Sequence, residues 1–249
     1  MTADLPGHER PFVLDVPARP RERQGQVDFY LPDQAGQAPA VLFVHGPLPE
    51  AQRPTPRDWP VFTGYARLVA TLGSVGVTVD HRLFGPDDFS RAAQDLADAV
   101  ELVRRDSRVD ADKIALWFFS GSGLLTPRWL ADPPAWLRCL AMTYPLLAPA
   151  SWWGPVNVGT LPSAAVEGAG SLPIVLTRVG LERPEVAATV ADFLTAAAAH
   201  EVDVEIIDVP NGHHAFDLKD YTDESRKAVV AAVRSVLGRL GISAGWPPP

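Results

Sequence analysis

The 249-residue chain contains a single cysteine, Cys139. One cysteine excludes an internal disulfide framework, an all-cysteine zinc site and a cysteine-held iron–sulfur cluster, and it fits a reducing compartment. The chain also lacks any apolar run approaching roughly 18 residues, so no segment is predicted to span a membrane. Its first residues, MTADLPGHERPF, lack the charged start and apolar core of a secretory signal, and we therefore expect a cytoplasmic protein.

The chain has fewer positively charged residues than negatively charged ones. The chain has 22 lysine and arginine residues against 30 aspartate and glutamate residues, a formal net charge of -8. A nucleic-acid partner normally requires a basic surface that replaces the counterions of the phosphate backbone. The composition therefore argues against a nucleic-acid partner. No internal repeat is evident.

Short apolar runs alternate with longer segments of helical period. The runs occupy residues 27–31, 40–44, 75–79, 114–119, 139–144, 174–177 and 204–209, and the helical segments 59–72, 89–105, 184–200 and 223–240. Strands that are apolar throughout are typical of parallel sheets buried on both faces. This order predicts an α/β fold with a mostly parallel central sheet and helices on both faces. No linker is evident, so we expect one domain over residues 1–249.

A serine–glycine turn follows the most apolar run. The run ends in Ser120-Gly121-Ser122-Gly123. A serine on a tight strand-to-helix turn exposes its hydroxyl, with backbone N–H groups close to it. We therefore expect Ser120 to be a nucleophile, with Ser122 as the rival and a plain flexible turn as the alternative. Phe118 stands where the G-x-S-x-G pattern has glycine, so the strict motif is absent.

A carboxylate and two histidines follow the last two apolar runs. Glu182 comes after 174–177, and His213 and His214 come after 204–209. The carboxyl ends of parallel strands meet at one edge of a sheet, where the serine also emerges. Histidine suits proton transfer near neutral pH, and a carboxylate can hold its second nitrogen. A solvated loop remains the alternative for each of them, and no third ligand supports a metal site at the histidine pair.

Residues 40–216 resemble the dienelactone hydrolase and acetyl esterase branch of the α/β-hydrolase superfamily. The matching motifs are VLFVHG (41–46), VTVDHRL (77–83), DADKIALWFFSGSG (110–123), TYP (143–145), PIVLTRVGLERPE (173–185) and PNGHHAFD (210–217). The resemblance implies the α/β-hydrolase fold, with Ser120 as nucleophile, Glu182 as acid and His214 as base. It selects His214 because the family's histidine precedes a small residue and a phenylalanine, and His213 is the second choice. No cofactor and no metal are implied.

The resemblance also implies an oxyanion hole built from backbone N–H groups. One is that of Gly121, and another comes from the loop after His45. The family carries two or more glycines there, whereas Gly46 is followed by Pro47, which has no N–H. Gly46 or Leu48 would then supply the second hydrogen bond. Loss of one such donor typically costs about 2.7 to 4 kcal/mol of transition-state stabilisation, so this loop decides how fast hydrolysis is.

Three further segments carry expectations. The stretch 145–173 is too long for an ordinary connection and is predicted to be a lid or pocket loop. Its Trp152 and Trp153 are candidates for the substrate pocket, with core packing as the alternative. The segment 80–82, Asp-His-Arg, is expected to brace loops. The run 204–209 is a candidate sheet edge, which leaves a homo-oligomer open.

These features predict a serine hydrolase that cleaves a carboxylic ester or lactone of a small to medium, partly apolar molecule. Two alternatives stay open. The same fold can serve a lyase, a cyclase or an acyl transferase, because Phe118 and Pro47 both alter the acyl-transfer site. A non-catalytic ligand-binding homologue is the other alternative.

Overall fold

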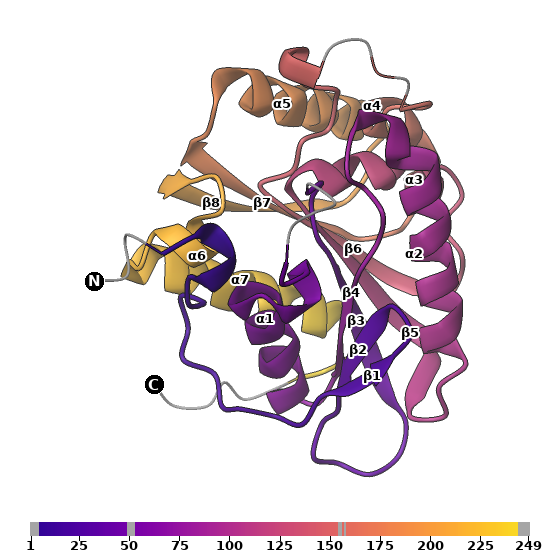
Figure 1. The fold of residues 1–249 in the computed structure, drawn as a ribbon. Helices are drawn as coiled ribbons and strands as arrows, with labels where there is room; N and C mark the ends of the chain where they lie inside the picture. Colours follow the sequence, from indigo (N-terminus) through magenta and orange to yellow (C-terminus); the bar gives the residue numbers. More distant parts are fainter. Residues whose placement is uncertain (1–4, 49–52, 154–155, 157, 244–249) are drawn as a thin grey trace.

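A twisted eight-stranded sheet runs through the middle of the molecule (Figure 1). The computed structural model describes residues 5–48, 53–153, 156 and 158–243. The strands are β1 (Glu22–Gln24), β2 (Val27–Tyr30), β3 (Ala38–Val44), β4 (Val75–Val79), β5 (Val109–Phe119), β6 (Leu137–Thr143), β7 (Ile174–Leu181) and β8 (Val204–His213). Their order is β1-β2-β4-β3-β5-β6-β7-β8. Strands β3 to β8 run parallel, and β1 and β2 pair antiparallel. The mostly parallel sheet is confirmed.

Helices cover both faces of this sheet (Figure 1). Helices α1 (Pro60–Thr71) and α7 (Asp223–Arg239) pack on one face, and α2 (Phe89–Arg104) and α5 (Pro184–Ala199) pack on the other. The short α-helices are α3 (Pro127–Ala131), α4 (Pro162–Ala165) and α6 (Phe216–Lys219). The 3-10 helices are η1 (Gly7–Glu9), η2 (Pro56–Asp58), η3 (Pro86–Asp88), η4 (Ser120–Leu125), η5 (Ser151–Trp153) and η6 (Val166–Ala169).

Successive side chains of a strand pack in two separate hydrophobic cores, one on each face of the sheet. On β5, Leu116 and Phe118 pack under α2 and α5, whereas Trp117 and Phe119 pack under α1 and α7. Side chains alternate between the faces of a strand, and here both faces are buried, which explains why the run is apolar throughout. The predicted helical segments begin and end close to the observed α1, α2, α5 and α7.

Two strands are longer than predicted, and this places the candidate residues. Strand β7 continues to Leu181 and β8 continues to His213, because the two strands stay paired up to the contact of Leu181 with His213. Residues 210–213 are therefore part of the strand, although the predicted run ended at 209. Glu182 and His214 are each the first residue beyond neighbouring strands. Strand β1 was missed because it is short and exposed.

The stretch 145–173 is not one continuous loop. Its second half contains α4 and η6, in which Ala165, Val166 and Ala169 are buried. A side chain on Gly168 would meet the Ala131 carbonyl oxygen at 2.3 Å, so this segment packs closely on α3. The first half contains η5, and residues 154, 155 and 157 lie outside the described part of the chain.

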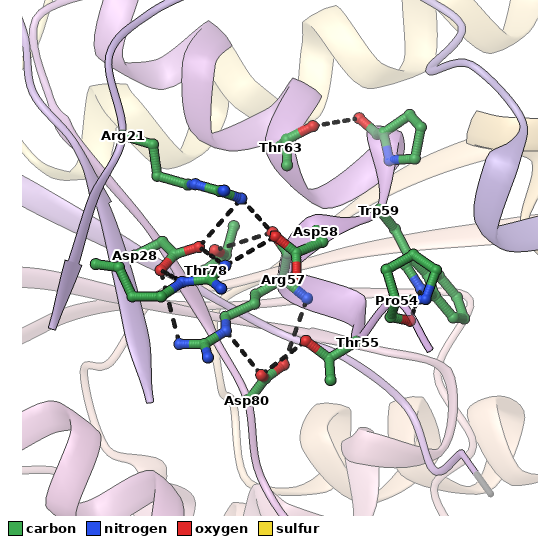
Figure 2. A network of polar contacts seen from close by, with 12 residues as sticks. Arg21, Asp28, Pro54, Thr55, Arg57, Asp58, Trp59, Thr63, Thr78 and Asp80 are labelled. Atoms are coloured by element: carbon green, nitrogen blue, oxygen red, sulfur yellow. Dashed lines mark hydrogen bonds and ion pairs between the residues drawn. The ribbon is translucent and has the colours of Figure 1, made fainter. Parts of the chain in front are cut away.

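A network of ion pairs ties the segment before α1 to the sheet (Figure 2). The Asp28 carboxylate on β2 is fully buried and accepts from Arg23 at 2.8 Å, with Arg21 and Arg57 close by. Asp80, just after β4, pairs with Arg57 at 2.8 Å and accepts from the Thr55 hydroxyl at 2.8 Å. Asp80 therefore braces the segment before α1, as was expected of the segment 80–82.

Strands β1 and β8 are the edges of the sheet, so the run 204–209 does lie at an edge. Helix α7 packs on β7 and β8 and is anchored at its start, where the Thr222 hydroxyl accepts the Ser225 N–H at 3.1 Å. None of the helices in the described ranges combines the length and apolarity needed to cross a bilayer.

Candidate active site

The turn after β5 has a left-handed residue at its tip. Ser120 has a φ of 56°, an uncommon conformation for a residue with a side chain. Gly123 allows the close approach behind it, since a side chain there would meet the Leu146 carbonyl oxygen at 2.8 Å. Ser120 is the first residue of the 3-10 helix η4, so the helix that follows β5 is of the 3-10 type. Strained serine turns of this kind are typical of exposed nucleophiles.

Ser122 lies inside the turn and is fully buried. Its hydroxyl oxygen accepts the Phe119 N–H at 2.9 Å, and the hydroxyl lies 2.8 Å from both the Val44 and Phe119 carbonyl oxygens. These contacts make Ser122 a structural residue that joins β3 to the turn. The burial and the hydrogen bonds of Ser122 favour Ser120 over this rival position.

Ser120, His214 and Glu182 are brought together at the carboxyl edge of the sheet. The Ser120 Oγ lies 2.7 Å from the His214 Nε2, and the His214 Nδ1 lies 2.6 Å from a Glu182 Oε2. A carboxylate only accepts hydrogen bonds, so the proton of a neutral His214 sits on Nδ1. The Nε2 lone pair then faces the Ser120 hydroxyl. This is the geometry that a general base requires.

Glu182 is shielded from water, with 6% of its side chain exposed. Burial by itself raises the pKa of this carboxyl, but the hydrogen bonds from His214 and from the Arg183 N–H outweigh it, so the pKa of Glu182 is lowered. The Arg183 N–H donates to the other carboxylate oxygen at 2.8 Å. Both oxygens are thus held, and the ionised carboxylate is ready to stabilise an imidazolium.

The His213 side chain contacts Asp220 and not Ser120. Its side chain is 58% exposed, and its Nδ1 lies 3.2 Å from Asp220. Because β8 extends to His213, the side chains of His213 and His214 leave the chain in different directions. Ala215 has a φ of 65° and turns the chain into α6 immediately after His214. The structure brings His214, and not His213, to Ser120.

In the loop after His45, the Leu48 N–H does not fill the role of oxyanion donor that was expected of it. The Leu48 N–H donates to the Leu83 carbonyl oxygen at 3.1 Å, so Leu48 is not a free donor and this assignment was wrong. Gly46 lies against Ser120, since a side chain there would meet the Ser120 Cβ at 3.2 Å and the Gly121 nitrogen at 3.4 Å. A side chain on Gly121 would in turn meet Pro47 at 2.6 Å. The backbone of Gly46 therefore lies close to Ser120 and to Gly121.

The two tryptophans have different surroundings. Trp152 is 50% exposed and lies under the Arg183 guanidinium at 5.1 Å. Trp153 packs on Phe89 at 5.9 Å, and its ring edge would be 3.5 Å from a side chain on Gly121. Phe89 in turn lines a surface pocket of about 450 Å³ together with Leu124 and Leu125. Only Trp153 is next to the nucleophile turn.

Sequence reasoning missed Tyr144, which lies beside His214, and its hydrogen-bond partner Asp217. Tyr144 follows β6, and its ring centre lies 4.8 Å from that of His214. Its hydroxyl donates to the Asp217 carboxylate, which is fully buried in α6. Both residues belong to motifs that carry the resemblance, TYP and HHAFD, but a motif gives no partner for a tyrosine hydroxyl.

The remaining predicted features fall outside this cluster. Cys139 is buried in β6, and burial raises the pKa of its thiol to about 12, as suits an inert core residue. His45 is buried and stacks on His81 at 3.8 Å. Among the described residues, no three His, Cys, Asp or Glu side chains are grouped as metal ligands would be.

Comparisons with solved structures show the same architecture. Esterase 2 of Thermogutta terrifontis superposes with a TM-score of 0.69 at 16% identity, covering 93% of this chain and 98% of that one. The carboxylesterase EstE1, from a metagenomic library, gives 0.69 at 17% identity and covers 92% of both chains. A Klebsiella pneumoniae protein provisionally named a dienelactone hydrolase gives 0.66 at 16% identity, covering 86% of this chain and 92% of that one.

No protein-family model and no curated protein matches the chain in sequence. The superpositions extend over most of each chain, so the agreement with the solved esterases is one of overall fold. The chain therefore has the α/β-hydrolase fold.

Proposed function

We propose that this protein is a serine hydrolase that cleaves a carboxylic ester or lactone of a small to medium, partly apolar molecule. The observation that carries the proposal is the continuous hydrogen-bonded path from Ser120 through His214 to Glu182. A nucleophile, a base and an orienting acid in this geometry perform acyl transfer on several unrelated folds. The esterases among the structural neighbours support the same reaction class.

The reaction follows from the positions of the three side chains. The Ser120 hydroxyl attacks the ester carbonyl carbon while the His214 Nε2 takes its proton, and Glu182 stabilises the resulting imidazolium. The imidazolium then returns the proton to the leaving alcohol, and an acyl group remains on Ser120. Water, deprotonated by His214, hydrolyses this acyl-enzyme. In a lactone, the alcohol and the acid released belong to one molecule.

The oxyanion of each tetrahedral intermediate would be bound by the Gly121 and Gly46 N–H groups. Pro47 has no N–H, and the Leu48 N–H is already bonded to Leu83. The proposed oxyanion hole therefore has two donors, the N–H groups of Gly46 and Gly121, and the loop after His45 supplies no further one. Since each donor is worth about 2.7 to 4 kcal/mol, hydrolysis of unactivated esters is expected to be slow.

Trp153 would form one wall of the acyl site. It stands beside Gly121 and Phe89, whereas Trp152 faces solvent and Arg183. An indole that lies close to both Gly121 and Phe89 would leave little room for a long acyl group, so substrates with short acyl groups are favoured. Trp152 is not included in this site.

Labelling with a fluorophosphonate probe tests the proposal directly. The probe phosphonylates a serine that an adjacent base activates, and the Thermogutta terrifontis esterase 2 neighbour has been solved phosphonylated by sarin. The wild-type protein is expected to react, Ser120→Ala and His214→Gln are expected not to react, and His213→Gln serves as the matched control that still reacts. Labelling of Ser120→Ala, or no labelling of the folded wild type, would contradict the proposal.

A second candidate function keeps the fold but changes the chemistry, giving a lyase, a cyclase or an acyl transferase. The bonded Leu48 N–H and Pro47 favour it, since they reduce the oxyanion hole. A panel of p-nitrophenyl esters distinguishes the two candidates. Rapid turnover of several esters supports hydrolysis and counts against the second candidate, whereas folded protein that fails to turn over any of them favours the second candidate.

A further inference from the structure

A buried carboxylate, that of Asp217, lies behind the Tyr144 side chain that contacts His214. Asp217 is 0% exposed, and two tyrosine hydroxyls donate to it. Tyr144 lies 2.9 and 3.0 Å from its two oxygens, and Tyr65 lies 3.1 Å from one of them. No cation pairs with Asp217 among the described side chains. Each partner of this carboxylate is therefore a neutral hydrogen-bond donor.

Tyr144 joins this carboxylate to His214. Its ring centre lies 4.8 Å from that of His214, with the ring planes inclined by 51°. The same ring touches Phe119, which precedes the nucleophile, and Phe216, which follows Ala215. The Tyr144 N–H donates to the Thr177 carbonyl oxygen at 2.8 Å, which anchors the residue to β7. Tyr144 is thus held from several sides in contact with the proposed base.

We propose that Tyr144 and Asp217 form a positioning pair that holds the His214 imidazole against Ser120 and stabilises its protonated form. Tyr144 supplies the contact surface, and Asp217 supplies a negative charge behind it. The pair acts through His214 and touches no reacting atom. The inference rests on the proposed function for its role in a reaction, but its effect on His214 can be measured without activity.

Two physical effects support this role. An aromatic face attracts a cation, so the Tyr144 ring favours an imidazolium over a neutral imidazole. A phenol that donates to an anion carries more electron density in its ring, which strengthens that attraction. The Asp217 charge adds a direct Coulomb attraction in surroundings where little water screens it. Both effects grow as positive charge develops on His214 in the transition state.

Burial raises the pKa of the Asp217 carboxyl to about 6, against the hydrogen bonds from Tyr144 and Tyr65 that lower it. The carboxylate is consequently charged at neutral and alkaline pH, where a serine hydrolase works. Other groups also act on His214 from the elements packed around it. The titratable and charged groups that face it are Ser120, Tyr144, Glu182, Asp217 and Lys219.

Tyr65 provides a matched control. Its hydroxyl donates to the same buried carboxylate, but its ring packs against Phe12, Phe43, Trp117 and Phe119 and not against His214. Tyr65→Phe and Tyr144→Phe therefore remove the same kind of hydrogen bond from Asp217. Only Tyr144→Phe changes a residue that touches the imidazole. Asp217→Asn removes the charge while it keeps the size of the side chain.

The test measures the His214 imidazole titration by NMR and, separately, the pH dependence of fluorophosphonate labelling. We expect Asp217→Asn to lower the midpoint of the His214 titration by about 0.5 to 1 pH unit, with Tyr144→Phe changed in the same direction and Tyr65→Phe unchanged. Labelling at pH 8 should slow about threefold to tenfold in Tyr144→Phe and in Asp217→Asn, and less than twofold in Tyr65→Phe. Thermal melting of each variant establishes that it is folded.

The outcomes separate the two proposals. Equal effects of Tyr65→Phe and Tyr144→Phe, or an unchanged His214 titration in folded Asp217→Asn, would overturn the positioning role. If the titration moves as expected but the wild type does not label, the positioning pair stands and the proposed hydrolase function fails. If Asp217→Asn does not fold, the comparison of Tyr144→Phe with Tyr65→Phe decides.

Discussion

The Leu48 N–H donates to the Leu83 carbonyl oxygen, 3.1 Å away. This bond ties the loop after β3 to the loop after β4. It also withdraws from the oxyanion site a donor that the sequence left open. The site is consequently more dependent on Gly46 than a loop with several free N–H groups would be.

Replacement of Gly46 by alanine is therefore expected to impair the reaction. A side chain there would lie 3.2 Å from the Ser120 Cβ and 3.3 Å from the Phe119 carbonyl oxygen, so the loop must shift away from the serine. We expect kcat/KM for p-nitrophenyl acetate to fall about 10-fold to 100-fold. Gly85→Ala is the control, because a side chain at Gly85 meets nothing within 4 Å. Equal activity of the two variants would show that Gly46 is not at the oxyanion site.

Ser122→Ala is expected to reduce stability and to keep the labelling of Ser120. The substitution leaves the buried Phe119 N–H without its acceptor at 2.9 Å. We expect the free energy of unfolding to fall by about 1 to 3 kcal/mol, measured by urea denaturation. Ser90→Ala, at an exposed serine of α2, should change it by less than about 0.5 kcal/mol. Loss of probe labelling in folded Ser122→Ala would reopen the question of which serine reacts.

Trp153→Ala is expected to change the preference for acyl length. Removing the indole opens space between Gly121 and Phe89, beside the pocket of about 450 Å³ that Phe89 lines. The ratio of kcat/KM for p-nitrophenyl octanoate to that for the acetate should rise about tenfold or more, since each buried methylene contributes about 0.8 kcal/mol. Trp152→Ala should leave the ratio within twofold of wild type. An unchanged ratio in Trp153→Ala would place the acyl site elsewhere.

Asp217 should make stability depend on pH with a definite sign. Its pKa rises from 3.8 to about 6 on folding, so the folded chain binds more protons than the unfolded chain between these values. The contribution of Asp217 to stability is therefore complete below about pH 4 and is lost as pH rises through 6, by about 3 kcal/mol in all. Urea denaturation from pH 4 to pH 7 should show this loss in wild type and not in Asp217→Asn. Parallel curves for the two proteins would contradict the expected ionisation.

Much of the fold could be predicted because the relevant signals are local. Apolar runs on β3 to β8 and helical periods on α1, α2, α5 and α7 depend on residues a few positions apart. Elements without such a signal were missed, among them β1, which is exposed, and η6, which is packed on α3. The ends of β7 and β8 were also placed too early, because polar residues can continue a strand whose partner holds it.

The residues of the candidate site likewise fall into those that the sequence indicated and those that it left open. The serine turn and the order Ser120, Glu182, His214 were visible in the sequence, since each residue follows a predicted strand and parallel strands end at one edge. The choice between His213 and His214 on residues alone stayed open, and so did the roles of Trp152, Trp153 and Leu48. Each of these depends on a contact between segments far apart in the chain, and periodicity carries no record of such contacts.

The sequence by itself therefore determined the α/β architecture, the absence of a cysteine framework and the three side chains that meet at the sheet edge. Only the tertiary structure decided that the Leu48 N–H is occupied, that Trp153 and not Trp152 stands at the nucleophile turn, and that Tyr144 links a buried carboxylate to His214. The reason is physical. Burial of apolar side chains follows local pattern, whereas hydrogen-bond partners and ring contacts are set by where distant segments are packed together.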